Sequence, residues 1–264
     1  MKPLSTPWPY PLWIAHRGAG KLAPENTVAA FRLGAQHGFR MFECDVKLSA
    51  DGVPFLLHDA TLERTTSGQG RAADWPWPDL AELDAGSWHG STYAGEPLPS
   101  FEQIARLVIE LGCALNVEIK PTPGQEAETG AGVAEAAARW WGGQSVPPLL
   151  SSFEPDALRA AQRVAPDLPR ALLLDKLWAG WHEVARELGV VAIVGNWRVL
   201  DAGVFELARA AGWRVLSYTV NDPAEVERLQ GLGIAGLITD AIDSLGPGGR
   251  PLAPAAKGGR RFGG

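Results

Sequence analysis

The sequence predicts a (β/α)8 barrel, the TIM-barrel fold, with a small insertion after the second strand region. Its 264 residues suffice for one such domain, and apolar strand-like runs alternate with helix-like segments without a second-domain linker, which disfavours an open doubly wound sheet. The ionisable residues that could do chemistry fall at or near the C-terminal ends of the runs, where such barrels carry their active sites. Principal strands are expected to begin at residues 12, 41, 114, 148, 170, 190, 214 and 236.

Two strands with a helix between them are expected at the start of the chain. The strands are the apolar runs at residues 12–16 and 41–48. Asn26 or Thr27 can cap the intervening helix, because short polar side chains accept the free N–H groups of a first turn. Gly38 can end that helix, because glycine readily adopts the left-handed conformation of a C-terminal cap.

Residues 61–98 interrupt the regular alternation. A tight turn at 50–52 leads into a further strand at 53–57, and the segment after it is rich in glycine and tryptophan, with little periodicity. Because a connection of this length in a compact barrel is often a lid or a binding loop, we expect an inserted lid-like segment at 61–98. Ser100 and Gln103 then predict the start of a helix through a capping box.

Strands and helices alternate regularly from residue 114 onwards. The expected strands are 114–119, 148–152, 170–174, 190–194, 214–220 and 236–239, and the expected helices are 131–141, 155–164, 180–188, 201–211 and 223–232. Together with the first part of the chain they predict a single domain at residues 1–245. The segment 246–264 is rich in glycine and proline, basic and free of acids, and is expected to be a flexible tail.

Composition restricts the partners and the compartment. The formal net charge is −6, and it is more negative without the basic tail, which argues against nucleic-acid binding. The two cysteines do not form a disulfide framework, and Cys44 is expected to be a buried thiol on a core strand. No apolar run is suited to a signal peptide or a membrane span, so a cytoplasmic protein is expected.

Three carboxylates on two predicted strands form a candidate metal site. Glu43 and Asp45 are two residues apart and therefore share one face of a strand, and Glu118 shares a face with Asn116 and Lys120. Like charges at such spacing repel unless a cation lies between them, and oxygen ligands suit Mg²⁺, Ca²⁺ or Mn²⁺ rather than zinc. The alternative is that each carboxylate pairs with a lysine or an arginine.

Two histidines at strand ends, His16 and His58, are a candidate general base and general acid, although either could be an ordinary hydrogen-bonded histidine. Arg17 and Lys120 are suited to contact a phosphate, because charge-assisted donors bind phosphoryl oxygens, or to neutralise the carboxylates. Phe153 closes a strand at the same end of the barrel and is a candidate substrate contact. The chain has no Walker A loop, GxSxG elbow, HExxH or CxxC motif.

These residues together resemble the glycerophosphodiester phosphodiesterase family, and most closely its cytoplasmic bacterial members. The order and spacing of the short motifs make the resemblance specific, and it covers roughly residues 12–245. The matching segments are His16-Arg17-Gly18, Pro24-Glu25-Asn26-Thr27, Glu43-x-Asp45, His58-Asp59, Leu98-Pro99-Ser100-Phe101, Glu118-Ile119-Lys120, Ser151-Ser152-Phe153, Tyr218-Thr219-Val220-Asn221 and Ile238-Thr239-Asp240.

The resemblance implies a metal-dependent hydrolase that converts glycerophosphodiesters to sn-glycerol 3-phosphate and an alcohol such as choline, ethanolamine or glycerol. It implies that the three carboxylates bind the cation, and that His16 is the base and His58 the acid, although the sequence leaves these two roles interchangeable. It also implies that the glycerol 2-hydroxyl is the first nucleophile. The expected partner is therefore a small phosphodiester, with no nucleic acid and no membrane span.

Two departures from the family pattern and two alternative functions remain. Tyr218 stands where many relatives carry tryptophan, and Trp197 follows a strand end where close relatives tend to carry histidine. Trp197 is therefore expected to affect which alcohol fits. The alternatives are a lysophospholipase D or phospholipase-C-like enzyme on the same barrel, which needs a path for an acyl chain, and a non-catalytic phosphodiester-binding protein.

Overall fold

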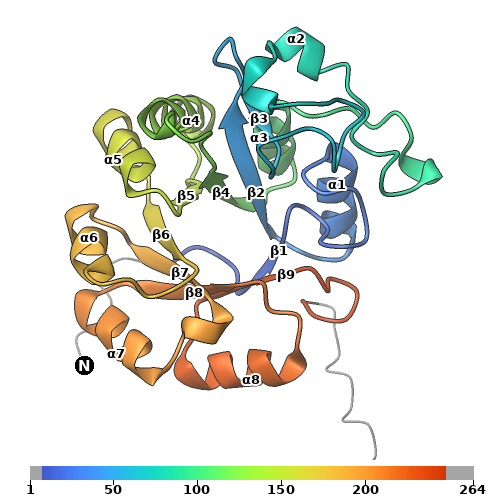
Figure 1. Ribbon diagram of the computed structural model, residues 1–264. Coiled ribbons are helices and arrows are strands. Elements are labelled where there is room, and N and C mark those ends of the chain that lie inside the picture. Colours follow the sequence, from blue (N-terminus) through green and yellow to red (C-terminus); the bar gives the residue numbers. More distant parts are fainter. Residues whose placement is uncertain (1–7, 248–264) are drawn as a thin grey trace, which may run out of the picture.

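Eight parallel strands close into a barrel with helices around it in the computed structural model, which describes residues 8–247 (Figure 1). The predicted TIM barrel is therefore confirmed. The barrel strands are β1 (Trp13–Ala15), β2 (Met41–Leu48), β4 (Ala114–Ile119), β5 (Leu149–Ser152), β6 (Arg170–Leu174), β7 (Ala192–Asn196), β8 (Arg214–Tyr218) and β9 (Gly236–Thr239).

The barrel closes through β1, which pairs with both β2 and β9. Ala15 is the residue of closure, because it lies opposite Phe42 on one side and Thr239 on the other. The short strand β3 (Pro54–Leu56) is antiparallel to the second half of β2 and lies outside the parallel set. It is the return strand that the turn at 50–52 predicted.

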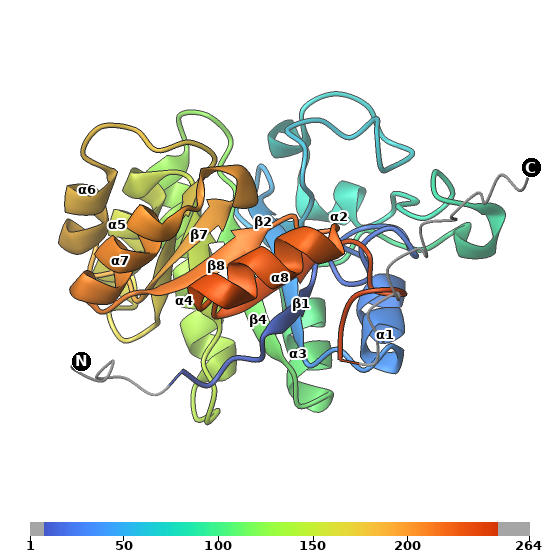
Figure 2. The same ribbon diagram turned by 90° about the horizontal axis from the view of Figure 1, so that it is seen from below.

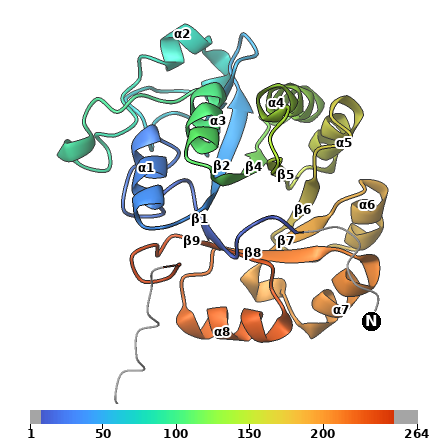
Figure 3. The ribbon, with the colours of Figure 1, turned by 180° about the vertical axis from the view of Figure 1, so that it is seen from behind.

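The helices follow the strands and cover the outside of the barrel, as the views from the front and from behind both show (Figures 1 and 3). They are α1 (Val28–Gln36), α3 (Phe101–Glu110), α4 (Glu126–Trp141), α5 (Pro155–Val164), α6 (Trp181–Glu187), α7 (Ala202–Ala211) and α8 (Pro223–Leu232).

Most element boundaries agree with the sequence to within one residue, and three elements differ by more. Helix α4 begins at Glu126 rather than at residue 131, because Glu126 and Glu128 in its first turn complement the positive end of the helix dipole. Strand β7 reaches Asn196 instead of ending at residue 194, and β8 ends at Tyr218 instead of at residue 220.

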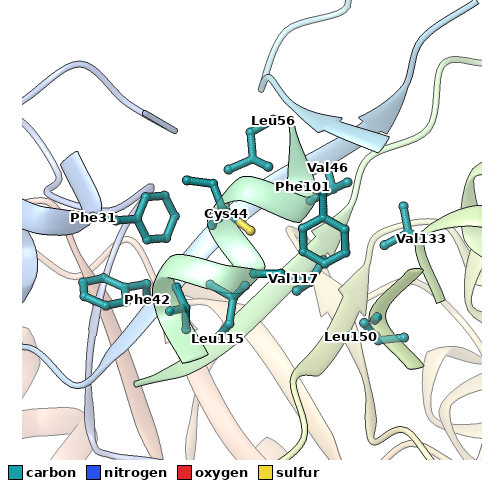
Figure 4. Packing of buried hydrophobic residues seen from close by; sticks show 14 of the residues in the cluster. Phe31, Phe42, Cys44, Val46, Leu56, Phe101, Leu115, Val117, Val133 and Leu150 are labelled. Atoms are coloured by element: carbon teal, nitrogen blue, oxygen red, sulfur yellow. The ribbon is translucent and has the colours of Figure 1, made fainter. Parts of the chain in front are cut away.

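Strand parity separates the packed core from the site. On β2, Phe42, Cys44 and Val46 point outward into a cluster that also receives side chains from β4, α1, α3 and α4 (Figure 4). The alternate residues of β2 point into the barrel, where Met41 packs at the bottom and the ionisable groups lie above it. Cys44 is a buried free thiol, as predicted.

The bottom end of the barrel, where the strands begin, has a packed interior. The chain before β1 crosses it (Figure 3), and the hydroxyl of Tyr10 donates a hydrogen bond to the carbonyl of Pro147 at 2.9 Å. Apolar side chains fill the barrel interior at this end. These side chains include Ile14, Leu149, Ala171, Val194 and Leu216.

The insertion lies beside β2 and α1 (Figure 2) and contains the short helices η1 (Ala72–Asp74), α2 (Trp77–Leu80) and η2 (Ser91–Tyr93). It has a small core of its own against β3, in which Phe55 and Leu57 pack with Leu62 and Leu80. Trp75 and Trp77, with other side chains, pack against this core. The lid role of residues 61–98 stays a prediction.

Within residues 8–247 no helix is long and apolar enough to cross a membrane. The tail predicted at 246–264 lies, from residue 248 on, outside the described residues.

Candidate active site

A cavity of about 250 Å³ opens at the C-terminal ends of the barrel strands. Its lining includes seven of the eight residues that the sequence singled out for chemistry, and the eighth, Asp45, lies directly behind them. The lining residues are His16, Arg17, Glu43, His58, Asn116, Glu118, Lys120, Phe153, Leu173, Asp175, Tyr218, Thr219 and Ile238. The barrel therefore brings together residues that are far apart in the chain.

The three carboxylates meet as the strand parity predicted. Asp45 lies opposite Glu118 in the β2–β4 register, and Glu43 precedes Asp45 on the same face. One oxygen from each of the three lies within 4.8 Å of the others. Oε1 of Glu43 is buried and receives no hydrogen bond from any described residue, and the buried Oδ1 of Asp45 has only the ammonium of Lys120 nearby, at 3.4 Å. Buried acceptors without a donor are costly, so this donor set fits a hard divalent cation.

Two cations flank the carboxylates without neutralising all of them. Nε of Arg17 lies 3.1 Å from Asp45, and Nζ of Lys120 lies 2.8 Å from Glu118 and 3.4 Å from Asp45. Pairing with lysine and arginine, the alternative from the sequence, therefore describes Asp45 well. Glu43 has only a main-chain hydrogen bond from the N–H of Arg17 at 3.1 Å and the imidazole of His16 at 3.8 Å.

The pKa values reflect this asymmetry. Burial and the charge of Asp45 raise the pKa of Glu43 to about 8, and the same two causes raise the pKa of Glu118. Burial alone would also raise the pKa of Asp45, but Arg17 and Lys120 outweigh it and lower that pKa. Without a bound cation, the Glu43 carboxyl therefore tends to keep its proton near neutral pH, and a cation would displace that proton.

The loop after β1 holds Arg17 and Asp45 in place. Asn26 donates from Nδ2 to Asp45 at 2.9 Å and accepts from the N–H of Asp45 at 3.2 Å, so its amide clamps that residue at two points. Arg17 and Asn26 have positive φ angles of 50° and 60°, which non-glycine residues adopt at an energetic cost. Thr27 rather than Asn26 caps α1, by accepting from the N–H of Ala30.

His16 follows β1 and is oriented by a carboxylate. Its Nδ1 lies 2.6 Å from Oδ1 of Asp240, and Nε2 faces Glu43. Asn221 holds Asp240, because it donates to the carboxylate at 3.2 Å and accepts from the N–H of Asp240 at 2.8 Å. Burial alone would lower the pKa of His16, but the hydrogen bond with Asp240 and the charge of Glu43 raise it.

His58 has a similar arrangement on the other side of the cavity. Its Nδ1 lies 2.7 Å from Asp59, whose carboxylate also binds Arg64 of the insertion. Lys47 donates to the main-chain carbonyls of His58 and Asp59 at 3.0 and 2.7 Å, which fixes the chain after β3 against β2. Burial lowers the pKa of His58, and the charge of Asp45 offsets part of this effect.

Several side chains around the cavity were not predicted as site residues. Asn116 points into it with neither amide atom hydrogen-bonded, although its shared face with Glu118 was a usable signal. Asp240 and Asp175 directly follow strand ends, as His16 and Lys120 do, and this position was the available signal for both. Tyr218 was noted in the sequence only as a departure from the family pattern.

The fold and the site define a (β/α)8-barrel enzyme with a carboxylate group suited to a metal ion between two carboxylate-bound histidines. The chain belongs to the glycerophosphoryl diester phosphodiesterase family, whose model matches residues 16–244. It is therefore a phosphodiesterase of the hydrolase class.

Similar proteins cover nearly all of the chain. It is 31% identical over 239 residues to a glycerophosphodiester phosphodiesterase of Caldanaerobacter subterraneus, covering 89% of this chain and 96% of that one. A crystal structure of an Oleispira antarctica phosphodiesterase in complex with the product sn-glycerol-3-phosphate superposes with a TM-score of 0.83 at 35% identity, covering 88% of this chain and 93% of that one. The glycerophosphodiester phosphodiesterase of Agrobacterium tumefaciens superposes with a TM-score of 0.73 at 26% identity, covering 88% and 97%.

Proposed function

We propose that this protein hydrolyses glycerophosphodiesters to sn-glycerol 3-phosphate and an alcohol, with a divalent cation at Glu43, Asp45 and Glu118. The observation that carries the proposal is the placement of two histidines, each bound through Nδ1 to a carboxylate, beside buried carboxylates, one of which has an oxygen without a donor among the described residues. The sn-glycerol-3-phosphate bound to the Oleispira relative agrees with this substrate class.

Mg²⁺, Ca²⁺ or Mn²⁺ fits these oxygen ligands. When bound, such a cation supplies positive charge for the phosphoryl group and lowers the pKa of a hydroxyl that it contacts. The chain itself adds Arg17 and Lys120, which line the cavity and are suited to bind phosphoryl oxygens. Phe153 gives the substrate carbons an apolar contact close to Lys120, whose Nζ lies 6.0 Å from the ring centroid.

The two histidines exchange protons with the substrate through Nε2. In the first half of the reaction, one histidine takes the proton of the glycerol 2-hydroxyl while the oxygen of that hydroxyl bonds to phosphorus. The bond from phosphorus to the alcohol oxygen breaks, and the other histidine protonates that oxygen. Water then opens the resulting cyclic phosphate with the two histidine roles reversed, and sn-glycerol 3-phosphate leaves.

Which histidine acts as the base in the first step depends on which of the two is neutral before the reaction begins. The family resemblance makes His16 the base. The raised pKa of His16 and the lowered pKa of His58 favour the opposite order in the cation-free protein, because the base must begin neutral. The pH profiles of the single variants distinguish the two orders.

The lysophospholipase D alternative fits the cavity less well. A volume of about 250 Å³ is below the usual range for drug-sized ligands, so the site suits a small diester better than one with a fatty acyl chain.

The test is release of glycerol 3-phosphate from glycerophosphocholine by purified protein, with and without chelator, beside a lysophospholipid as competing substrate. We expect turnover of glycerophosphocholine that depends on the cation. Faster turnover of the lysophospholipid would favour the alternative enzyme, and no turnover with metal supplied would favour a binding protein.

A further inference from the structure

The cavity has a second wall that takes no part in the proposed proton transfer or cation binding. The rest of the lining includes Phe153, Leu173, Tyr218, Thr219 and Ile238, with one acidic residue, Asp175. They come from the ends of strands β5, β6, β8 and β9. This wall is mostly apolar and aromatic, with a single carboxylate.

Asp175 differs from the other carboxylates of the site in its partner. Asp45, Asp59 and Asp240 each lie beside an arginine, lysine or histidine nitrogen. Asp175 accepts a hydrogen bond from the neutral amide of Asn196 at 2.9 Å, and within residues 8–247 no side-chain cation lies within 4.0 Å of it. Its negative charge is therefore held in place and not neutralised.

The aromatic ring of Tyr218 lies close to this charge, and a second ring packs against it. The rings of Phe153 and Tyr218 pack edge to face, with centroids 5.8 Å apart. The hydroxyl of Tyr218 is buried and lies close to the carboxylate of Asp175. Burial and the neighbouring carboxylates of Asp175 and Glu118 raise the pKa of Tyr218, so the phenol stays neutral.

A carboxylate beside aromatic rings is the combination that binds alkylammonium groups. The ring quadrupoles attract a cation, and the carboxylate adds a full negative charge. Asp175 is exposed at the mouth of the cavity, whereas Glu43 and Asp45 are buried at its base. A diester whose phosphate lies over the base can therefore extend its outer alcohol towards Asp175.

We propose that this wall is the subsite for the released alcohol, and that Asp175 selects alcohols with a positive charge, such as choline or ethanolamine. This inference rests on the proposed function. The sequence suggested that Trp197 affects which alcohol fits. The structure instead points to Asp175 and to Asn196, the neighbour of Trp197, which orients Asp175. The ring of Trp197 instead packs under the guanidinium of Arg198, 4.2 Å from its centroid, and does not line the cavity.

The alternative is that the glycerol moiety of the substrate lies on this wall and that Asp175 accepts hydrogen bonds from the glycerol hydroxyls. The two arrangements differ in one measurable respect. Every substrate contains glycerol, so loss of a glycerol contact weakens all substrates equally. Loss of a head-group contact weakens only substrates with a cationic alcohol.

The test compares Asp175→Asn with the wild type on glycerophosphocholine and on glycerophosphoglycerol, whose head group is neutral. Asparagine keeps the shape and can still accept from Asn196. We expect the ratio of kcat/KM for the choline substrate to that for the glycerol substrate to fall about tenfold, as for the loss of a partly desolvated cation contact. Choline added as a competing ligand should also inhibit the variant more weakly than the wild type.

The matched control is Asp167→Asn, which removes the same charge from an exposed residue before β6, at the opposite end of the barrel. Its ratio should equal that of the wild type. An unchanged ratio in Asp175→Asn, or an equal loss on both substrates, would overturn the inference and leave the proposed function intact. A wild-type protein inactive on both substrates with metal supplied would overturn the proposed function, and the inference with it.

Discussion

Asp240 and His16 are 224 positions apart in the chain, yet their side chains lie 2.6 Å apart across the closure of the barrel. Because the ionised carboxylate can only accept, Nδ1 of His16 carries the proton and Nε2 is directed at the cavity. A catalytic imidazole held in one tautomer can exchange protons without first reorienting. The last strand of the barrel therefore positions a group on the first.

Asp240→Asn should lower kcat at least about tenfold with little change in KM, because an amide at this position no longer fixes the tautomer of His16. The measurement is steady-state kinetics over a range of pH, since a change confined to folding would not move the pH profile. Asp243→Asn, at an exposed site close by, is the control and should behave as the wild type. Unchanged kcat and pH profile in Asp240→Asn would show that the pair has no such role.

His16→Ala and His58→Ala should each lower turnover about a hundredfold or more, because each removes a proton-transfer group. Circular dichroism in the far ultraviolet should change little. His182→Ala, on the surface of α6, serves as the control. Near-wild-type turnover by either of the first two variants would exclude that histidine from the mechanism.

Chelation should abolish activity, and Mg²⁺, Mn²⁺ or Ca²⁺ should restore it, because the buried Oε1 of Glu43 has no donor among the described residues. Glu43→Ala should lose metal binding, measured by calorimetry, while it keeps the fold. Full activity in an exhaustively chelated sample shown to be metal-free would contradict the metal site.

The stability of the chelated protein should depend on pH through Glu43. Its pKa rises from 4.5 to about 8 on folding, so the folded state holds a proton that the unfolded state has lost. The contribution of this group is complete below pH 4.5 and is lost as the pH rises towards 8.

The melting temperature of the chelated wild type should therefore fall between these pH values by more than that of Glu43→Gln, and added Mg²⁺ or Mn²⁺ should reduce the fall. Glu135→Gln, at an exposed position in the middle of α4, provides the charge-matched control. Parallel melting curves for the wild type and Glu43→Gln would show that Glu43 is ionised without the cation.

A substrate that lacks the glycerol 2-hydroxyl should bind but turn over very slowly, because the attacking group is missing. Competition against glycerophosphocholine measures its binding, and product release measures its turnover. Hydrolysis as fast as that of the parent would mean that water attacks phosphorus directly.

The alternation of side chains along a strand allowed the three carboxylates of the site to be predicted from the sequence. Spacing by two along one strand placed Glu43 beside Asp45, and the register of β2 with β4 brought Glu118 to them. These relations are local or involve one strand pair, so a single sequence can reveal them.

Contacts made by barrel closure and by loops were not predictable in the same way. The contact of Asn26 with Asp45 was not predictable, because an asparagine at this place equally suits a helix cap. The contact also depends on the positive φ angle of Asn26, which no sequence pattern indicated. The contact of Asn196 with Asp175 joins two neighbouring strand ends, and an acid or an amide after a strand is equally typical of a turn. Only the three-dimensional arrangement distinguishes these roles.

The order of the site along the chain has a consequence for how such enzymes diversify. The proposed metal ligands, both histidines and the cations proposed to bind phosphate come from residues 16–120, whereas the apolar wall comes from residues 153–238. Apart from Asp240, the second half of the chain contributes surroundings and no reacting group. Substitutions there are expected to change which alcohol is accepted while the reaction chemistry stays intact, so selectivity and chemistry can evolve separately in the two halves of one barrel.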